Sequence, residues 1–369
     1  MILRSPSSTK HWLRDIDWVL VGIVIAISLM GLRQIYSATL NTEFASAYGQ
    51  HCVWLALGFV LFWIVSTFNY HHGVGASPIL WIAGIVLLGV VLAFAEPVNG
   101  ARRWLPTPFG FSIQASEFMK VVLVLVVAKY CSDYTTKTLG ARDIVTIGVI
   151  FGMPFGLVLL QPDLGTALSI IPLAGMVLYL STIRAKHWVA LCLLAVVLLP
   201  VGWSMLKPYQ RDRITGFMDP DKAPRSTGYQ IRQSKIAVGA GGIWGQGHVQ
   251  GSQTQLRFLP TPHTDFIFAA FAEEEGFVGI VIALALYYVL LMRIVEIGKT
   301  AADAEGMLVA ISVATLLLFH IVVNVGMVAN KLPVTGLPLP LMSYGGSSLL
   351  TVLTMLGLVH SVRMRRFVN

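Results

Sequence analysis

The chain has 369 residues, of which 56% are hydrophobic and only 12% charged, and its formal net charge is +8. Soluble domains carry about a quarter charged residues, so this composition excludes an ordinary soluble protein. A charge of +8 would suggest nucleic acid as the partner of a soluble chain, but we find no nucleic-acid-binding signature, and membrane topology explains the charge better.

Apolar runs of about 20 residues recur along the chain and predict membrane-spanning helices. The first run follows Lys10 and Arg14, continues past the length of a signal-peptide core and lacks a convincing cleavage site, so we expect a retained helix. We expect an all-α polytopic membrane protein that forms a single domain over residues 1–369. The ten predicted spans are Trp18–Ser37, Gly49–Phe68, Ser77–Ala95, Ala115–Ser132, Ile144–Leu160, Gly165–Leu180, Trp188–Leu206, Phe266–Met292, Met307–Val328 and Leu341–Val362.

An even number of spans puts both termini on one side of the membrane. The positive-inside rule makes the side with short basic segments cytoplasmic. These segments are Lys10–Arg14, Lys137–Arg142, Arg184–Lys186, Arg293–Lys299 and Arg363–Arg366. The opposite side then holds one large loop, residues 207–265, between the seventh and eighth spans. Its aromatic residues and its glycine-rich stretch 238–247 indicate an ordered loop, and Ile231–Val238 is a candidate short amphipathic helix.

The loops on this opposite side are basic, against the usual bias of translocated segments. Arg102 and Arg103 lie in the first of them, and Arg211 and Arg213 begin the long one. An anionic ligand would explain these charges, because guanidinium groups bind phosphates through paired hydrogen bonds. The alternative is a solvated surface that faces anionic lipid headgroups. We take the four arginines as candidates for substrate contact.

Asp265 lies where the long polar loop meets a strongly apolar helix. An acid at such a junction has one dehydrated face and one wet face, an environment in which the pKa of a proton acceptor can be tuned. The alternative is that Thr264 or Asp265 is the N-cap of the following helix. Capping would lower the pKa of the acid, whereas burial would raise it. His263 is a neighbouring candidate for orienting a substrate.

Two further charged sites lie within apolar segments. Glu117 and Lys120 are three residues apart on one helix face, so we expect them to pair and to face a polar cavity. The alternative is a pair that reaches water at the helix end. Asp163 follows Pro162, which breaks a helix and frees carbonyls that must line a cavity or contact protein. Asp163 could equally cap the helix that begins at Leu164.

Three consecutive acids, Glu273, Glu274 and Glu275, lie within the eighth predicted span. A helix turns about 100° per residue, so the three cannot share one face. At least one must meet a polar partner, for which Lys120 or a loop arginine is a candidate, and a structural network is the favoured interpretation.

No motif predicts a metal site made by protein side chains alone. The three cysteines lie in or beside apolar runs and indicate membrane packing, not a disulfide framework. The histidines show no metal-ligand spacing. The residues concerned are Cys52, Cys131, Cys192, His71, His72, His320 and His360.

Several motifs carry a resemblance to a known family over essentially the whole chain. They are Phe258–Gly279, with His263-Thr-Asp-Phe-Ile-Phe at its centre, Pro333–Ser348, Asn99-Gly-Ala-Arg-Arg-Trp-Leu, Gln114-Ala-Ser-Glu with Lys120, Gln161-Pro-Asp-Leu-Gly-Thr and Gly228-Tyr-Gln-Ile with Gln233-Ser. The chain closely resembles the SEDS family, the RodA/FtsW/SpoVE group of cell-wall polymerases. Gln233-Ser-Lys and Gly251-Ser-Gln-Thr-Gln-Leu are more similar to the RodA (elongation) branch than to the FtsW (division) branch.

The resemblance implies an inverting peptidoglycan glycosyltransferase that polymerises lipid II in the bacterial inner membrane, with its site on the periplasmic side. It implies that Asp265 is the general base, and that the partner is a class B penicillin-binding protein, a transpeptidase. Membrane lipids surround the chain, and a divalent cation (Mg²⁺ or Mn²⁺) is a candidate for stabilising the leaving pyrophosphate. Two alternatives stay open: a lipid II flippase, and a non-catalytic scaffold of the wall-synthesis complex.

Overall fold

The structure is a computed structural model. It describes residues 16–40, 42–96, 102–106, 112–134, 140–180, 206–219 and 227–366, and scattered positions between 187 and 204. Helices make up nearly all of it. In chain order they are α2 (Trp18–Thr39), α3 (Ala45–Thr67), α4 (Tyr70–Phe94), α5 (Ala115–Tyr134), α6 (Ala141–Leu160), α7 (Leu164–Leu180), α9 (Pro208–Met218), α10 (Thr227–Gly241), α11 (Ser252–Gln255), α12 (Ile267–Lys299), α13 (Ala304–Val328) and α14 (Gly346–Met364).

The helical prediction is confirmed, and the chain is a multi-pass membrane protein. Within the described ranges, seven helices are long and apolar enough to cross a membrane: α2, α3, α4, α6, α12, α13 and α14. Helices α5 and α7 also follow predicted spans, but α5 carries more charge and α7 has only 17 residues. The predicted span Trp188–Leu206 lies largely outside the described residues, so the count of ten stays a prediction.

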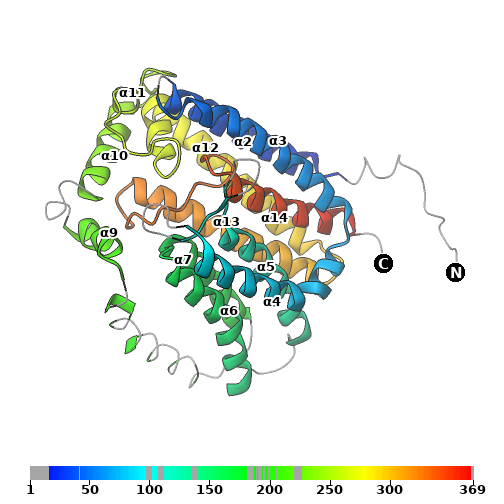
Figure 1. Cartoon of the computed structure of the whole chain (residues 1–369). Coiled ribbons are helices and arrows are strands. Elements are labelled where there is room, and N and C mark those ends of the chain that lie inside the picture. The colour runs from blue at the N-terminus through cyan, green and yellow to red at the C-terminus, as the bar shows by residue number, and fades with distance from the viewer. Residues whose placement is uncertain are drawn as a thin grey trace.

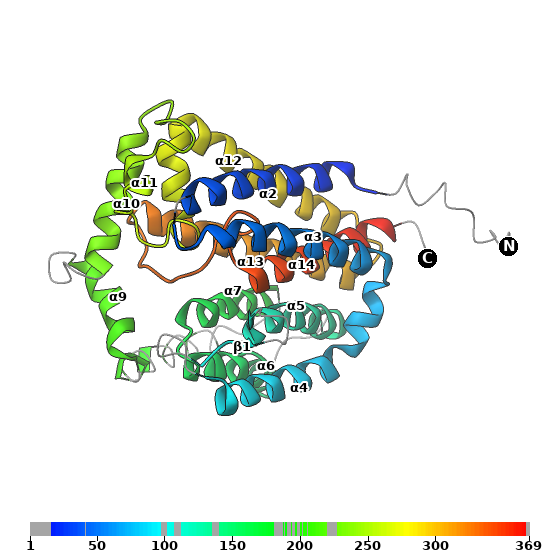
Figure 2. The same cartoon turned by 45° about the horizontal axis from the view of Figure 1, so that its top comes forward.

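Helices α13 and α14 form the centre of the bundle. About 67% of the apolar stretch of α13 and 72% of that of α14 are buried, against 17% for α4. Helix α14 packs on α3, and α13 packs on α12, α5 and α7. Both views of the bundle show α13 and α14 between the blue helices α2 and α3 and the green helices α6 and α7 (Figures 1 and 2). The inner helices are thus shielded from lipid by the outer ones.

One end of the bundle is closed by a charged cluster. Asp17 caps α2 by accepting from the backbone N–H of Leu20, and it pairs with Arg293 of α12 at 2.8 Å and Arg363 of α14 at 3.5 Å. Its backbone N–H donates to His360 of α14. The beginning of α2 and the end of α14 therefore meet at the same end, as an even number of crossings requires.

The other end carries the connections that the sequence assigns to the translocated side. Strands β1 (Leu105–Pro106) and β2 (Ser112–Ile113) form a two-stranded antiparallel sheet before α5. Helices α9, α10 and α11, all from the long loop, lie across this end of the bundle (Figures 1 and 2). The short helix predicted at Ile231–Val238 is confirmed as part of α10.

Helix α12 is broken at Gly276, whose φ of 66° and ψ of −165° are not helical. The glycine-rich segment 242–247 supplies the hydrogen bonds that the break removes. The carbonyls of Glu273 and Glu274 accept from residues 246 and 247, and the N–H groups of residues 277 and 278 donate to residues 242 and 243. A side chain at Gly276 would have its Cβ 2.2 Å from the backbone nitrogen of Gly245, so only glycine fits there.

The three glutamates next to this break have separate partners, as a structural network requires. Glu273 is buried and accepts from the backbone N–H of Gln253 (2.6 Å) and Thr254 (3.1 Å) at the start of α11. Glu274 accepts from Ser37 of α2. Glu275 pairs with Arg33 of α2 at 2.8 Å. The candidates Lys120 and a loop arginine were therefore wrong, because α2 lies closer to this part of α12.

The last predicted span, Leu341–Val362, begins too early. Helix α14 starts only at Gly346, and residues 341–345 are not helical. The reason is that this segment bonds to the loop before α12. Ser343 Oγ donates to the Thr264 carbonyl at 2.8 Å, and the Tyr344 N–H donates to the His263 carbonyl at 2.9 Å.

Candidate active site

A cavity of about 810 Å³ opens at the end of the bundle that carries β1, β2 and α9. Its walls come from the β1–β2 region, the beginnings of α5 and α7, helix α9, and the segments that precede α12 and α14. Five charged side chains line it: Arg103, Glu117, Asp163, Arg213 and Asp265. Segments distant in sequence thus bring three acids and two arginines to one polar chamber inside an apolar bundle.

Asp265 is largely buried at the cavity wall, just before α12. The N-cap of α12 is Phe266, and no side chain bonds to the free N–H groups there, so neither Thr264 nor Asp265 caps this helix. Burial raises the pKa of Asp265, whereas Arg213 and Arg103 lower it and Asp163 raises it further; the net direction is upward. The carboxylate is therefore a stronger base than an ordinary aspartate.

Arg213 is held beside Asp265 by helix α9. Its Nη1 donates to the Thr335 carbonyl at 2.9 Å, and its guanidinium lies 5.9 Å from the centre of the Tyr209 ring. Tyr209 in turn donates to the Pro162 carbonyl at 2.6 Å. A Cβ on Gly336 would lie 3.1 Å from Arg213 Nη1 and 3.6 Å from Asp265 Oδ2, so this glycine leaves the space between them open.

Asp163 has both of the roles weighed from sequence. It caps α7, accepting from the backbone N–H of Thr166 at 3.3 Å and from the Thr166 hydroxyl at 3.0 Å. It also lines the cavity, where Arg103 Nη1 lies 3.7 Å away and the Gln114 amide donates to it. The capping contacts fix the position of the carboxylate, and the cavity contacts place the guanidinium group of Arg103 beside it.

Glu117 and Lys120 form the ion pair that their spacing predicts, with Lys120 Nζ 2.8 Å from Glu117 Oε1. Glu117 lines the cavity, whereas Lys120 is only 1% exposed and lies behind it. The second oxygen of Glu117 has no hydrogen-bond partner among the described residues. The pair is thus buried and does not reach water at a helix end as the alternative required.

The other three candidates do not line the cavity. Arg102 is exposed, and Arg211 donates to the Ser204 carbonyl. His263 is buried against the rings of Phe44 (4.9 Å between centroids) and Tyr344 (5.8 Å). Burial lowers the pKa of His263, which keeps the ring neutral.

Sequence reasoning missed residues that hold the site together. Asn324 of α13 is fully buried and donates to the carbonyls of Asp265 (3.0 Å) and Leu337 (2.8 Å). An asparagine inside an apolar span was a visible signal, because a buried amide requires partners. Gln114 and Gly336 lie within motifs that carry the resemblance, but nothing in their spacing predicts what they touch.

The whole chain matches a family of known proteins. Residues 11–367 match the FtsW/RodA/SpoVE family, described as cell cycle proteins. The peptidoglycan glycosyltransferase MrdB of Escherichia coli K12 is 40% identical over 366 residues, covering 98% of this chain and 97% of that protein. The peptidoglycan glycosyltransferase RodA of Treponema pallidum is 32% identical, covering 95% and 98%.

Solved structures agree. A chain from a study titled "Structural coordination of polymerization and crosslinking by a peptidoglycan synthase complex" superposes with a TM-score of 0.81 at 32% identity, covering 96% of this chain and 99% of that one. The rod shape determining protein RodA of Thermus thermophilus superposes with a TM-score of 0.71 at 30% identity, covering 96% and 98%. The chain belongs to the FtsW/RodA/SpoVE family.

Proposed function

We propose that this protein is a peptidoglycan glycosyltransferase that polymerises lipid II into glycan strands during cell elongation, with Asp265 as its general base. The observation that carries the proposal is the position of Asp265, a largely buried acid with a raised pKa in a cavity that also holds Arg103 and Arg213. Relatives at 40% and 32% identity, matched over at least 95% of both chains, bear the name peptidoglycan glycosyltransferase.

The reaction requires a base and a stabilised leaving group. The carboxylate of Asp265 takes the proton from the acceptor sugar's 4-hydroxyl as its oxygen attacks the anomeric carbon of the donor. The bond from that carbon to the lipid pyrophosphate breaks, and the configuration inverts from α to β. A positioned base contributes about 10²–10⁴-fold to such a step. The lipid pyrophosphate leaves as an anion that needs no proton, so this single displacement uses one carboxylate as base, whereas an inverting hydrolase uses an acid–base pair.

The arginines have two effects in this scheme. Arg103 and Arg213 favour the ionised form of Asp265, because they lower a pKa that burial alone would raise further. Guanidinium groups also bind phosphate oxygens through paired hydrogen bonds, so the same residues can hold the departing pyrophosphate. Asp163, with Arg103 3.7 Å away, would set the position of that arginine.

A divalent cation remains a proposal. Among the described residues, no three His, Cys, Asp or Glu side chains cluster as a metal site. Mg²⁺ is commonly bound by one or two carboxylates together with substrate phosphates. Asp163 or Asp265 could hold a cation in that way, with the pyrophosphate supplying the other ligands and the cation helping to neutralise its charge.

We place the chain in the bacterial inner membrane with both termini cytoplasmic and the cavity on the periplasmic side. The charged cluster around Asp17, Arg293 and Arg363 supports this orientation, because basic residues gather on the cytoplasmic side. As partner we propose a class B penicillin-binding protein, a transpeptidase that crosslinks the new strand. One structural neighbour comes from a peptidoglycan synthase complex.

A flippase is the rival function, because transporters use broken helices and buried charges. The break in α12 does not support it. The backbone groups freed at Gly276 are bonded to segment 242–247, and neither that segment nor Gly276 lines the cavity. The buried pair Glu117–Lys120 does border the cavity and suits either function.

Polymerisation of labelled lipid II by the purified protein with its transpeptidase partner tests the proposal. We expect Asp265→Asn, which keeps the shape of the side chain, to abolish polymer. Asp212→Asn is the matched control, since Asp212 is exposed on α9 and does not line the cavity. Polymer at the wild-type rate with Asp265→Asn would refute the general base. Movement of lipid II between liposome leaflets without polymer would favour the flippase.

A further inference from the structure

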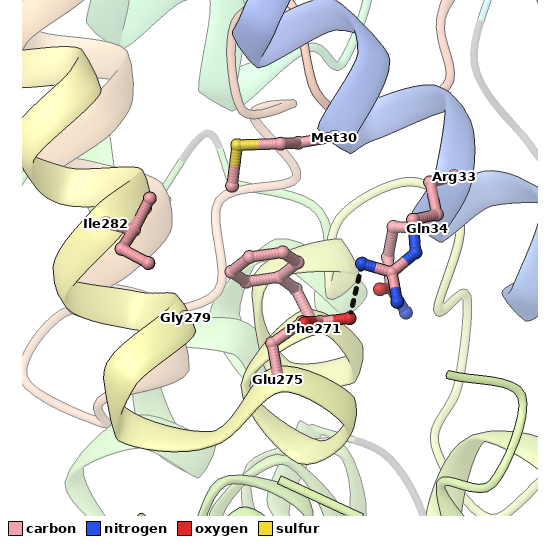
Figure 3. A pocket seen from close by; sticks show the side chains of 7 residues that line it. All are labelled: Met30, Arg33, Gln34, Phe271, Glu275, Gly279 and Ile282. Atoms are coloured by element: carbon pink, nitrogen blue, oxygen red, sulfur yellow. Dashed lines mark ion pairs between the residues drawn. The ribbon is translucent and has the colours of Figure 1, made fainter. Parts of the chain in front are cut away.

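A second, smaller pocket lies between α2 and α12, away from the cavity (Figure 3). Its volume is about 90 Å³, about that of three waters at ~30 Å³ each. Arg33, Gln34 and Met30 enter it from α2, and Glu275 and Ile282 from α12. It shares no lining residue with the cavity in the described part of the chain, so it has no part in the reaction proposed above.

The pocket lies at a defined depth in the membrane. Helices α2 and α12 run antiparallel and are joined at both ends by ion pairs, Asp17 to Arg293 and Arg33 to Glu275, each at 2.8 Å. At 1.5 Å per residue, the two pairs are separated by about 24 Å along α2, and the unbroken part of α12 from Gly276 to Arg293 is about 26 Å long. The hydrocarbon core of a bilayer is about 30 Å thick. In the orientation proposed above, this separation puts Asp17–Arg293 at the cytoplasmic boundary and Arg33–Glu275 near the opposite boundary, because charged side chains avoid the hydrocarbon core.

The surface between these two pairs faces lipid. Ile25 and Leu29 of α2 are 41% and 55% exposed, and Val281 and Ile282 of α12 are 48% and 51% exposed. The Arg33 side chain is 53% exposed and lies at the edge of this apolar surface that is farther from Asp17. A molecule with acyl chains on that surface would therefore bring its headgroup to the pocket.

The pocket offers a cation, an anion and a buried donor. The ion pair engages one nitrogen of the Arg33 guanidinium, which has five N–H donors. Glu275 presents its carboxylate at the same opening and is 25% exposed. Gln34 is 2% exposed, and its amide nitrogen has no hydrogen-bond partner among the described residues. A buried amide donor without a partner is costly, so its position in the pocket wall indicates a ligand that accepts from it.

We propose that this pocket binds the headgroup of phosphatidylethanolamine in the outer leaflet of the membrane. The phosphate accepts from the remaining N–H groups of Arg33 and from the Gln34 amide, and the primary ammonium donates to Glu275. A headgroup that carries only negative charge would be repelled by the Glu275 carboxylate and should bind less well. A trimethylammonium headgroup has no N–H to donate.

The test measures which lipids the whole protein retains. Wild type, Arg33→Gln, Glu275→Gln and Gln34→Met are reconstituted in nanodiscs of equal parts phosphatidylethanolamine, phosphatidylcholine and phosphatidylglycerol with identical acyl chains. The protein is then extracted in mild detergent, and retained lipids are counted by native mass spectrometry. Arg142→Gln is the control, because Arg142 is an exposed arginine at the start of α6, away from the pocket.

We expect wild type and Arg142→Gln to retain phosphatidylethanolamine preferentially. Arg33→Gln should reduce that preference by at least about tenfold, the loss of one charge-assisted hydrogen bond, and Gln34→Met should reduce it less. Glu275→Gln should shift the preference to phosphatidylglycerol. Equal retention of the three lipids by wild type, or one preference common to all variants, would overturn the assignment. The second result would mean that the bound lipid lies elsewhere.

Discussion

Asn324 gives the sharpest test of how the site is built, because it touches the backbone of Asp265 and does not line the cavity. Its amide donates to the Asp265 and Leu337 carbonyls at 3.0 and 2.8 Å, and its own oxygen has no partner among the described residues. Asn324→Leu keeps the approximate volume and removes both donors. Asp265, the proposed general base, then loses the contact that ties its backbone to α13.

The magnitude follows from these contacts. Leaving two buried carbonyls unsatisfied costs about 1–3 kcal/mol each, and removing the unpartnered Asn324 oxygen recovers about as much as one of them. The net cost is about 2 kcal/mol. If that cost falls on the placement of Asp265, the rate of polymerisation drops about 30-fold, since 1.4 kcal/mol corresponds to a factor of ten. KM should change little, because the contact lies behind the catalytic group.

The assay is the initial rate of lipid II polymerisation over a range of substrate concentrations, with thermal unfolding measured on the same samples. Ser312→Ala is the control: Ser312 is also buried in α13, but its hydroxyl bonds within the helix to Leu308. Asn324→Asp keeps the shape of the side chain but replaces the amide donor by an oxygen that faces two carbonyls. It should therefore be at least as harmful as Asn324→Leu. Near-normal activity of either Asn324 variant would refute the reasoning.

Three further predictions follow from the same structure. Burial raises the pKa of Asp265, so activity should fall as the pH drops through that raised value. Arg213→Gln removes a positive charge that lowers this pKa, so the acid limb of the pH–rate profile should move to higher pH. The control variant Arg211→Gln should leave the acid limb where it is in the wild type. Glu117→Gln or Lys120→Met alone leaves one buried charge and should cost about 3–5 kcal/mol of stability. The double variant should recover most of it in thermal unfolding, and additive losses would contradict the pairing. Gly276→Ala should lower the unfolding temperature sharply, whereas Gly148→Ala, where a new Cβ meets no atom within 4 Å, should not.

The fold was largely predictable because a helix satisfies all the backbone hydrogen bonds of a single segment in lipid, and runs of about 20 apolar residues mark such helices in the sequence. Nine of the ten predicted ranges overlap a described helix over most of their length. The errors arose where tertiary contacts override local pattern. Residues 341–345 are apolar enough to extend α14, but bonds from Ser343 and Tyr344 to the loop before α12 hold them out of the helix.

The candidate site was predictable where charge alone marks it. Arg103, Glu117, Asp163, Arg213 and Asp265 stood out because charged residues near a membrane span require partners, and the structure brings them to one cavity. Spacing did not distinguish Arg102 from Arg103 or Arg211 from Arg213. Neighbouring side chains on a loop or a short helix point in different directions, and only the fold shows which of them points into the cavity. It also could not predict that Asp265 is free of a capping role.

The break in α12 bears on how the protein is assembled. Segment 242–247 precedes α12 in the chain, and in the orientation proposed above it must be translocated before it can reach Gly276. Until it does, the carbonyls of Glu273 and Glu274 and the N–H groups of residues 277 and 278 lack partners, and each such group costs several kcal/mol in lipid. In that orientation, α12 cannot complete its crossing independently of the loop that precedes it. Biogenesis of this half of the bundle should be cooperative, and export defects in the loop should appear as failed integration of α12.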